Sequence, residues 1–142
     1  MTKKLVVVLS FLFIFLYTTY ANAQDFKHVE IFDPKQDKVV KVVQLNTQIQ
    51  SIITNWIKNI DIIYGKNNPI TDDGYAIKVP LEPAIKVNCN SFNAIVSEVY
   101  IIIPKTEPPF YIVFEDENKV SCFPFNGDIN ILSDILDFKL RL

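Results

Sequence analysis

The apolar residues in segment 47–65 recur with the spacing of an amphipathic helix. They stand three and four positions apart, which places them on one helical face. Thr47 and Gln50 have the spacing of a capping box, and Gly65 is a typical helix stop. Isoleucine is not a strong helix former, so this long helix must gain its stability by packing on a sheet. The apolar residues are Ile49, Ile52, Ile53, Trp56, Ile57, Ile60 and Ile63.

Alternating apolar and polar positions predict β-strands in most of the remaining chain. Short polar segments follow the first and the fifth of these strands and predict antiparallel hairpins. Pro80 and Pro83 are expected to interrupt the strand that begins at Tyr75, which then resumes at 84–88. The predicted strands cover 27–32, 38–44, 75–79, 94–103, 110–115 and 119–125.

A second, shorter helix is predicted near the C-terminus. Asp128 is a suitable N-cap, and apolar residues between Ile131 and Leu136 then lie on one face. Because the strands cluster instead of alternating with helices, the pattern predicts an α+β fold. We expect an antiparallel sheet of about five to six strands, with the long helix packed on one face and the short C-terminal helix after the last strand.

The first 23 residues have the layout of a secretory signal peptide. Lys3 and Lys4 precede an apolar run from Leu5 to Leu16 that is interrupted only by Ser10. The small residues Ala21 and Ala23 then match a cleavage site. We therefore predict cleavage after Ala23 and export of residues 24–142 as a single domain. The alternative is a retained N-terminal membrane anchor, for which the apolar run alone is short.

Composition and charge narrow the classes of partner. Removal of the two signal lysines takes the formal net charge from −2 to −4. The chain has no basic block and one arginine, Arg141, which disfavours nucleic acid and anionic lipid surfaces as partners. After signal cleavage no further apolar run approaches the length of a membrane span.

The two cysteines, Cys89 and Cys122, are predicted to form a disulfide. Export places a small domain in an oxidising compartment, where paired cysteines usually form a bridge. The alternative is two buried thiols. The cysteines lack the Cys-x-x-Cys spacing of redox and zinc motifs.

Candidate catalytic residues are few. His28 is the sole histidine and is expected to be a strand residue near a terminus, so neither a catalytic triad nor a histidine zinc site is predicted. The acidic clusters Asp72–Asp73 and Glu115–Glu117 lie where the chain should turn and lack the calcium-loop pattern. We therefore assign no catalytic residue, metal ligand or cofactor.

Aromatic residues are dense in the last strands. If Cys122 faces the helix-covered core, alternation places Phe123 and Phe125 on the opposite sheet face. Tyr111 likewise points away from Phe110 and Phe114. Tyr111, Phe123 and Phe125 are therefore the candidate binding residues, because exposed aromatic side chains mark interaction surfaces. The alternative is a second small core beneath the C-terminal helix or the proline loop.

These observations favour a small exported, non-enzymatic domain that binds another exported protein or a component of a bacterial envelope. The first alternative is a glycan hydrolase whose carboxylates converge in a cleft. The residues available for it are Asp72, Asp73, Glu98 and Glu115. The second alternative is a carrier with an apolar cavity between the Trp56 helix and the sheet.

The export hypothesis predicts a defined mature N-terminus. Mass spectrometry of the exported protein should find Gln24, or a near neighbour, as the first residue, because cleavage follows the small residue Ala23. An exported protein that still begins at Met1 would instead support the retained anchor.

Overall fold

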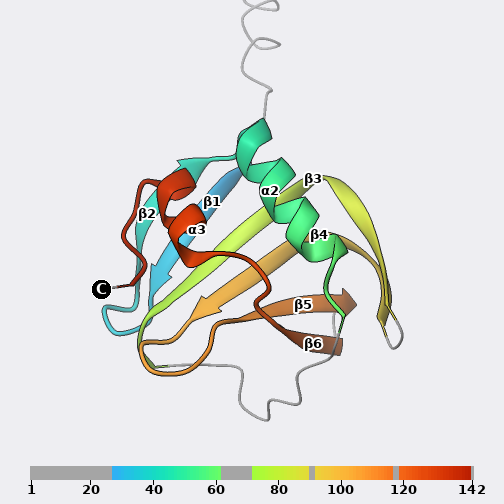
Figure 1. Cartoon of the computed structure of the whole chain (residues 1–142). Helices are drawn as coiled ribbons and strands as arrows, with labels where there is room; N and C mark the ends of the chain where they lie inside the picture. The colour runs from blue at the N-terminus through green and yellow to red at the C-terminus, as the bar shows by residue number, and fades with distance from the viewer. Residues whose placement is uncertain (1–26, 62–71, 90–91, 117–118, 142) are drawn as a thin grey trace, which may run out of the picture.

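The computed structural model describes residues 27–61, 72–89, 92–116 and 119–141. Within these ranges the chain forms six strands and two helices (Figure 1). The predicted signal segment, residues 1–23, lies outside the described residues. In chain order the elements are β1 (His28–Asp33), β2 (Lys38–Gln44), α2 (Thr47–Lys58), β3 (Tyr75–Cys89), β4 (Phe92–Ile103), β5 (Phe110–Asp116), β6 (Lys119–Pro124) and α3 (Ile129–Leu136).

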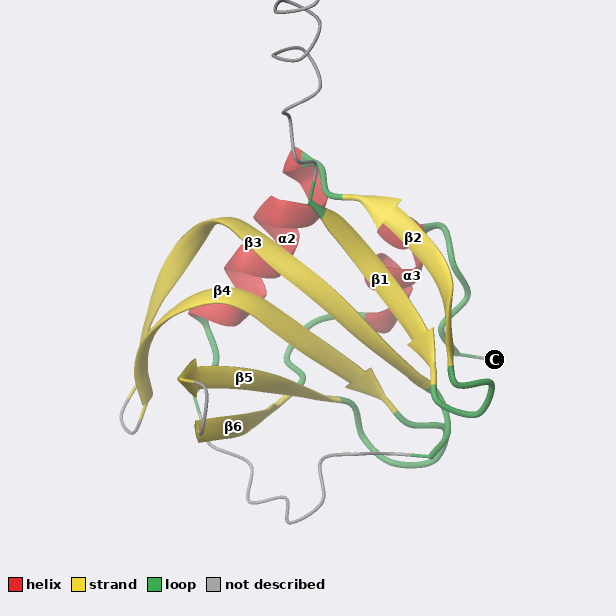
Figure 2. Ribbon diagram, turned by 180° about the vertical axis from the view of Figure 1, so that it is seen from behind, coloured by secondary structure: helices red, strands yellow, loops and turns green. Residues whose placement is uncertain are grey.

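The strands form one antiparallel sheet in the order β2-β1-β3-β4-β5-β6. Both predicted hairpins, β1–β2 and β5–β6, are present. Since β2 and β3 lie on the two sides of β1, the connection that contains α2 passes over one face of the sheet. Figure 2, seen from behind, shows the strands in front of both helices. The α+β fold with an antiparallel sheet is therefore confirmed, and α2 and α3 cover the same face.

The first helix starts one residue earlier than the capping box predicts. Asn46 is the N-cap, and its side-chain oxygen accepts a hydrogen bond from the backbone N–H of Ile49 at 2.8 Å. Asparagine is preferred over threonine at this position, so Thr47 becomes the first helical residue.

The first helix is also shorter than predicted. It has 12 residues and ends at Lys58, because the backbone N–H of Asn59 turns back to the carbonyl of Trp56 at 3.1 Å. The expectation of one long helix is therefore wrong. Ile60 remains buried beyond the helix end, and the predicted stop at Gly65 lies outside the described residues.

The isoleucine face of α2 packs on the sheet as predicted. Ile49, Ile53 and Ile57 have no exposed surface and share one core with the inward side chains of the strands. Burial of each such side chain stabilises the fold by about 1.5–3 kcal/mol. From α3, Leu132 and Leu136 join the same core. The main core therefore lies between the sheet and the two helices.

The third strand is one continuous element, where two pieces were predicted. Between Pro80 and Ile85, β3 advances five residues while β4 advances two, so the excess residues form a bulge. This bulge accommodates Pro83 outside the regular hydrogen-bond ladder. There the N–H of Glu82 donates to the side chain of Gln50 on α2 at 3.1 Å.

The predicted N-cap of the second helix is confirmed. The carboxylate of Asp128 accepts hydrogen bonds from the backbone N–H groups of Asn130 (2.7 Å) and Ile131 (3.3 Å). At the other end, Asp137 takes the left-handed conformation, and Lys41 of β2 donates to its carbonyl at 3.3 Å. These contacts hold α3 over β1 and β2.

Asn126 joins three parts of the molecule. Its side-chain oxygen accepts a hydrogen bond from the Tyr111 hydroxyl at 2.7 Å, and its amide nitrogen donates to the carbonyl of Trp56 at 2.8 Å. That carbonyl belongs to the last turn of α2 and also accepts the backbone N–H of Asn59. Burial raises the pKa of the Tyr111 hydroxyl well above its ordinary value, so this group remains a neutral donor. The Asn126 side chain therefore supplies a hydrogen-bond partner to the buried Tyr111 hydroxyl and to the Trp56 carbonyl at the end of α2.

Replacement of Asn126 by alanine should lower the free energy of unfolding by about 2–3 kcal/mol, because it leaves the buried Tyr111 hydroxyl without its acceptor. Urea denaturation measures this change. In Tyr111→Phe the unsatisfied hydroxyl is absent, so the double variant should cost less than the sum of the two single changes. Asn130→Ala, on the exposed side of α3, serves as the control. If the change in the free energy of unfolding in the double variant equals the sum of the changes in the two single variants, this role of Asn126 is contradicted.

Candidate functional site

The aromatic residues predicted as a binding surface lie in the main core. Tyr111 and Phe123 have no exposed surface, and Phe125 is partly buried against the same core. The Phe125 ring meets Trp56 edge-on, with centroids 5.4 Å apart. Cys122 faces away from the helices, and alternation therefore turns Phe123 inward. The predicted exposed patch at these residues is wrong, and a core that reaches beneath α3 is found in its place.

The predicted disulfide is not formed. Cys89 and Cys122, both among the described residues, are thiols in the structure. Cys89 packs against the main core on the helix-covered face. Cys122 belongs to a small cluster with Ile102 and Phe110 on the opposite face. Because the sheet separates the two sulfur atoms, no bridge joins them.

The carboxylates considered for a hydrolase lie apart. Asp72–Asp73 precedes β3, and Asp73 accepts a hydrogen bond from a backbone N–H at 3.1 Å. Glu98 pairs with Lys78 in the middle of the sheet at 3.8 Å. Glu115 pairs with Lys119 at the end of β5 at 2.7 Å. Asp73, Glu98 and Glu115 therefore each serve a separate contact, and the carboxylates do not converge in one cleft.

His28 is exposed at the start of β1, as predicted for a strand residue near a terminus. Within the part of the chain that the structure describes, no group of three histidine, cysteine or acidic side chains could hold a metal ion.

Apolar side chains form a patch on the sheet face that no described helix or strand covers. Two register pairs build it, Tyr100 with Ile112 and Phe114 with Val120. The Tyr100 and Phe114 rings are in edge contact, with centroids 5.6 Å apart. Phe114 and Val120 are each 45% exposed. We call Tyr100, Ile112, Phe114 and Val120 the open-face patch; it spans β4, β5 and β6.

Charged residues border the open-face patch on the side of β3 and β1. The pKa of Tyr100 is raised to about 12, first by partial burial and then by a hydrogen bond to Glu98 and the charges of Glu98 and Glu30. Lys78 lies directly opposite Tyr100 in the β3–β4 register and pairs with Glu98. An apolar centre with a polar rim is the usual anatomy of a protein interface.

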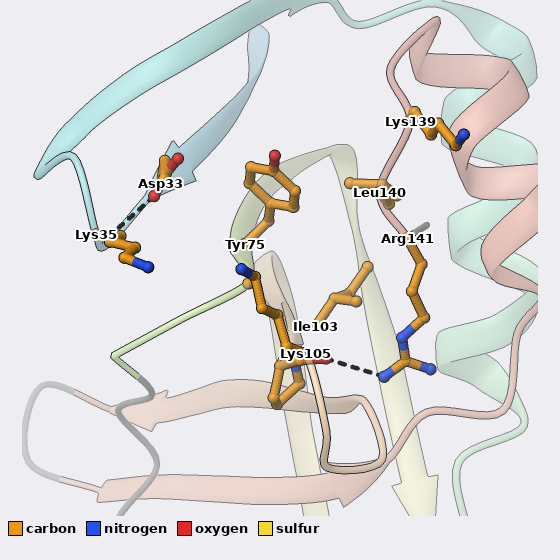
Figure 3. Close-up of a pocket in the computed structure, with 10 residues that line it drawn as sticks. Asp33, Lys35, Tyr75, Ile103, Lys105, Lys139, Leu140 and Arg141 are labelled. Carbon is orange, nitrogen blue, oxygen red and sulfur yellow. Dashed lines mark hydrogen bonds between the residues drawn. The ribbon is translucent and has the colours of Figure 1, made fainter.

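A cavity of about 500 Å³ opens at the end of the sheet where β1 and β4 finish and β3 begins (Figure 3). Gly74 shapes this end: its φ is +71°, and a Cβ there would lie 1.9 Å from the carbonyl oxygen of Ile103. Only glycine permits such a close approach. The lining residues are Asp33, Lys35, Gly74, Tyr75, Ile103, Pro104, Lys105, Lys139, Leu140 and Arg141.

Asp33 is the only acidic residue in this lining, and its charge is already engaged. Burial would raise the pKa of its carboxyl group, but hydrogen bonds outweigh it and lower the pKa. The donors are the side chain and backbone N–H of Gln36 and the backbone N–H of Lys35. The Lys105 charge lowers the pKa further. Asp33 is therefore ionised and closes the β1–β2 turn.

The sequence pattern did not single out the cavity residues. Lys35 and Lys105 occur in segments predicted as loops, and Arg141 was noted only as the sole arginine. In an antiparallel sheet the end of β1, the start of β3 and the end of β4 lie at the same edge. The sequence could have indicated the cavity only through the order of the strands in the sheet, because that order decides which strand ends lie together. Hydrophobic spacing does not reveal the strand order.

No protein-family model, curated protein or solved structure matches this chain. Among the described residues, neither helix is long and apolar enough to cross a membrane.

The position of the cysteines predicts two reactive thiols. Unfolded protein that has never met a reductant should react with two equivalents of Ellman's reagent, because the sheet separates the sulfur atoms. In the folded protein the half-buried Cys89 should react faster than Cys122, which is 7% exposed. Cys89→Ser should leave one equivalent. Thiols that emerge only after reduction would contradict the structure.

Proposed function

We propose that this chain is a small exported, non-enzymatic domain that binds another exported protein, or a protein component of the envelope, through the open-face patch. The observation that carries the proposal is the asymmetry of the sheet. One face is buried under α2 and α3, whereas the other presents Phe114 and Val120 at 45% exposure with no described element over them. Exposed apolar side chains gathered on adjacent strands mark interaction surfaces.

The composition of the patch favours a protein partner. Tyr100 and Phe114 are already held in edge contact, so little side-chain freedom is lost when a partner packs on them. Rigid aromatic anchors of this kind supply much of the binding energy in protein interfaces. The mixed charges of Glu30, Lys78 and Glu98 beside them suit a polar rim.

Export rests on the sequence of the first 23 residues. The basic pair at Lys3 and Lys4, the apolar run to Leu16 and the small residues before Gln24 support a cleaved signal. An exported domain meets other exported proteins first, which is why we propose a partner of that class.

The two alternative functions receive less support. The carboxylates of a hydrolase do not converge, as described above. A carrier would need space between α2 and the sheet, yet Ile49, Ile53 and Ile57 fill that interface with no exposed surface.

Phe114→Asp should reduce partner recovery at least about tenfold, because it places a charge in the centre of an apolar contact. The measurement is quantitative mass spectrometry after chemical cross-linking of the exported protein in its own envelope and culture fractions. Ile95→Asp is the matched control: Ile95 is 72% exposed and lies outside the patch, near the β3–β4 turn. Thermal melting should show that both variants remain folded.

Equal recovery with Phe114→Asp and Ile95→Asp would contradict the proposal, as would the absence of any cross-linked protein. Sedimentation equilibrium identifies a second copy of the chain as the partner if self-association is lost in Phe114→Asp alone.

A further inference from the structure

Positive charge is concentrated around the cavity at the end of the sheet. Lys35, Lys105, Lys139 and Arg141 line it, against Asp33 as the one acidic residue. The chain as a whole has a formal net charge of −2, so the net charge of this region is opposite in sign to that of the whole chain. Clefts lined by charge of one sign concentrate ligands of the opposite sign.

In the described part of the chain, Asp33 is the one carboxylate of the cavity lining, and it offsets only part of the positive charge of the four cations there. The ion pairs found among the described residues engage Lys41, Lys78 and Lys119, and none of these lines the cavity. Figure 3 shows the ammonium ends of Lys35 and Lys105 directed toward the space beside the Tyr75 ring. Two cations share this space with one carboxylate, Asp33, which already accepts hydrogen bonds from the β1–β2 turn, and this excess of positive charge favours an anionic ligand between them.

The same cavity has an apolar side. The Tyr75 ring, Ile103 and Leu140 line it, and Ile103 and Leu140 are almost fully buried. Tyr75 is fixed by an edge contact with Phe138, with ring centroids 5.0 Å apart. A cavity of about 500 Å³ with an apolar body and a few polar groups matches the usual size of a small-molecule site.

The walls of the cavity are held in place without a ligand. The Nη2 atom of Arg141 donates to the carbonyls of Pro104 at 2.9 Å and Glu107 at 3.0 Å, which ties the segment after α3 to the β4–β5 loop. The backbone N–H of Leu140 donates to the Ser133 hydroxyl at 3.3 Å. A ligand would therefore lose little affinity to ordering of the site.

We propose that this cavity binds a small organic anion that has a compact apolar body. Its carboxylate or phosphate lies between the ammonium groups of Lys35 and Lys105, and its body packs against Tyr75 and Leu140. Lys139 lies at the rim and points toward α3, so it contributes long-range attraction only (Figure 3).

Phenyl phosphate is the first probe, because it combines a charge with an aromatic body. Isothermal titration calorimetry should show that it binds at least about tenfold more tightly than inorganic phosphate, which lacks the apolar contact. Benzyl alcohol, which has the ring without the charge, should bind more weakly than phenyl phosphate. Phenylacetate distinguishes a carboxylate site from a phosphate site.

Lys35→Gln and Lys105→Gln should each weaken phenyl phosphate binding about five- to tenfold. These changes should leave the fold intact, because Lys35 and Lys105 donate hydrogen bonds to Asp33 and Asp73 through their backbone N–H groups, which the substitutions retain. Lys86→Gln, an exposed lysine in the other half of β3, is the matched control and should bind as the unaltered protein does.

Absence of phenyl phosphate binding, or equal binding by all three glutamine variants, would overturn the proposal. The result is independent of the open-face patch: Phe114→Asp should leave phenyl phosphate binding unchanged, and Lys35→Gln should leave partner recovery unchanged. Loss of one property without the other shows which proposal has failed.

Discussion

Burial of the isoleucine face of α2 on one side of the sheet determines how the rest of the molecule is arranged. A helix of 12 residues with several isoleucines has little stability alone, so it depends on the sheet for its own formation. In turn, the sheet receives from Ile49, Ile53 and Ile57 the apolar cover that its inner face requires. α3 completes this cover, and on the opposite face Phe114 and Val120 remain partly exposed among the described residues.

Much of the fold was predictable because it depends on local periodicity. Two-residue alternation identifies the strands, and the i, i+3, i+4 spacing identifies both helices. The errors arise where a local hydrogen bond overrides the pattern. Apolar spacing continues to Ile63, but the helix ends at Lys58 because Asn59 turns back to Trp56. Pro83 does not end β3, because a bulge takes it out of the ladder.

The candidate sites were less predictable because each depends on long-range geometry. The inward or outward direction of a whole strand changes with a shift of one residue. The assumption that Cys122 faces the helices reversed the assignment of Phe123. The bridge to Cys89 was predicted from export and the pair of cysteines alone, which carry no information on the sheet face of each sulfur atom. The open-face patch contains Phe114, which the sequence pattern places on the sheet face opposite Tyr111. The cavity required the strand order, which hydrophobic spacing does not contain.

The sole tryptophan makes the docking of α2 directly observable by spectroscopy. Trp56 lies on Gly127, where a Cβ would come within 2.6 Å of the indole ring, and it is in T-shaped contact with the Phe125 ring. Intrinsic fluorescence therefore reports on one joint of the molecule, between α2 and the segment that leads into α3. A change in emission therefore signals movement at that joint.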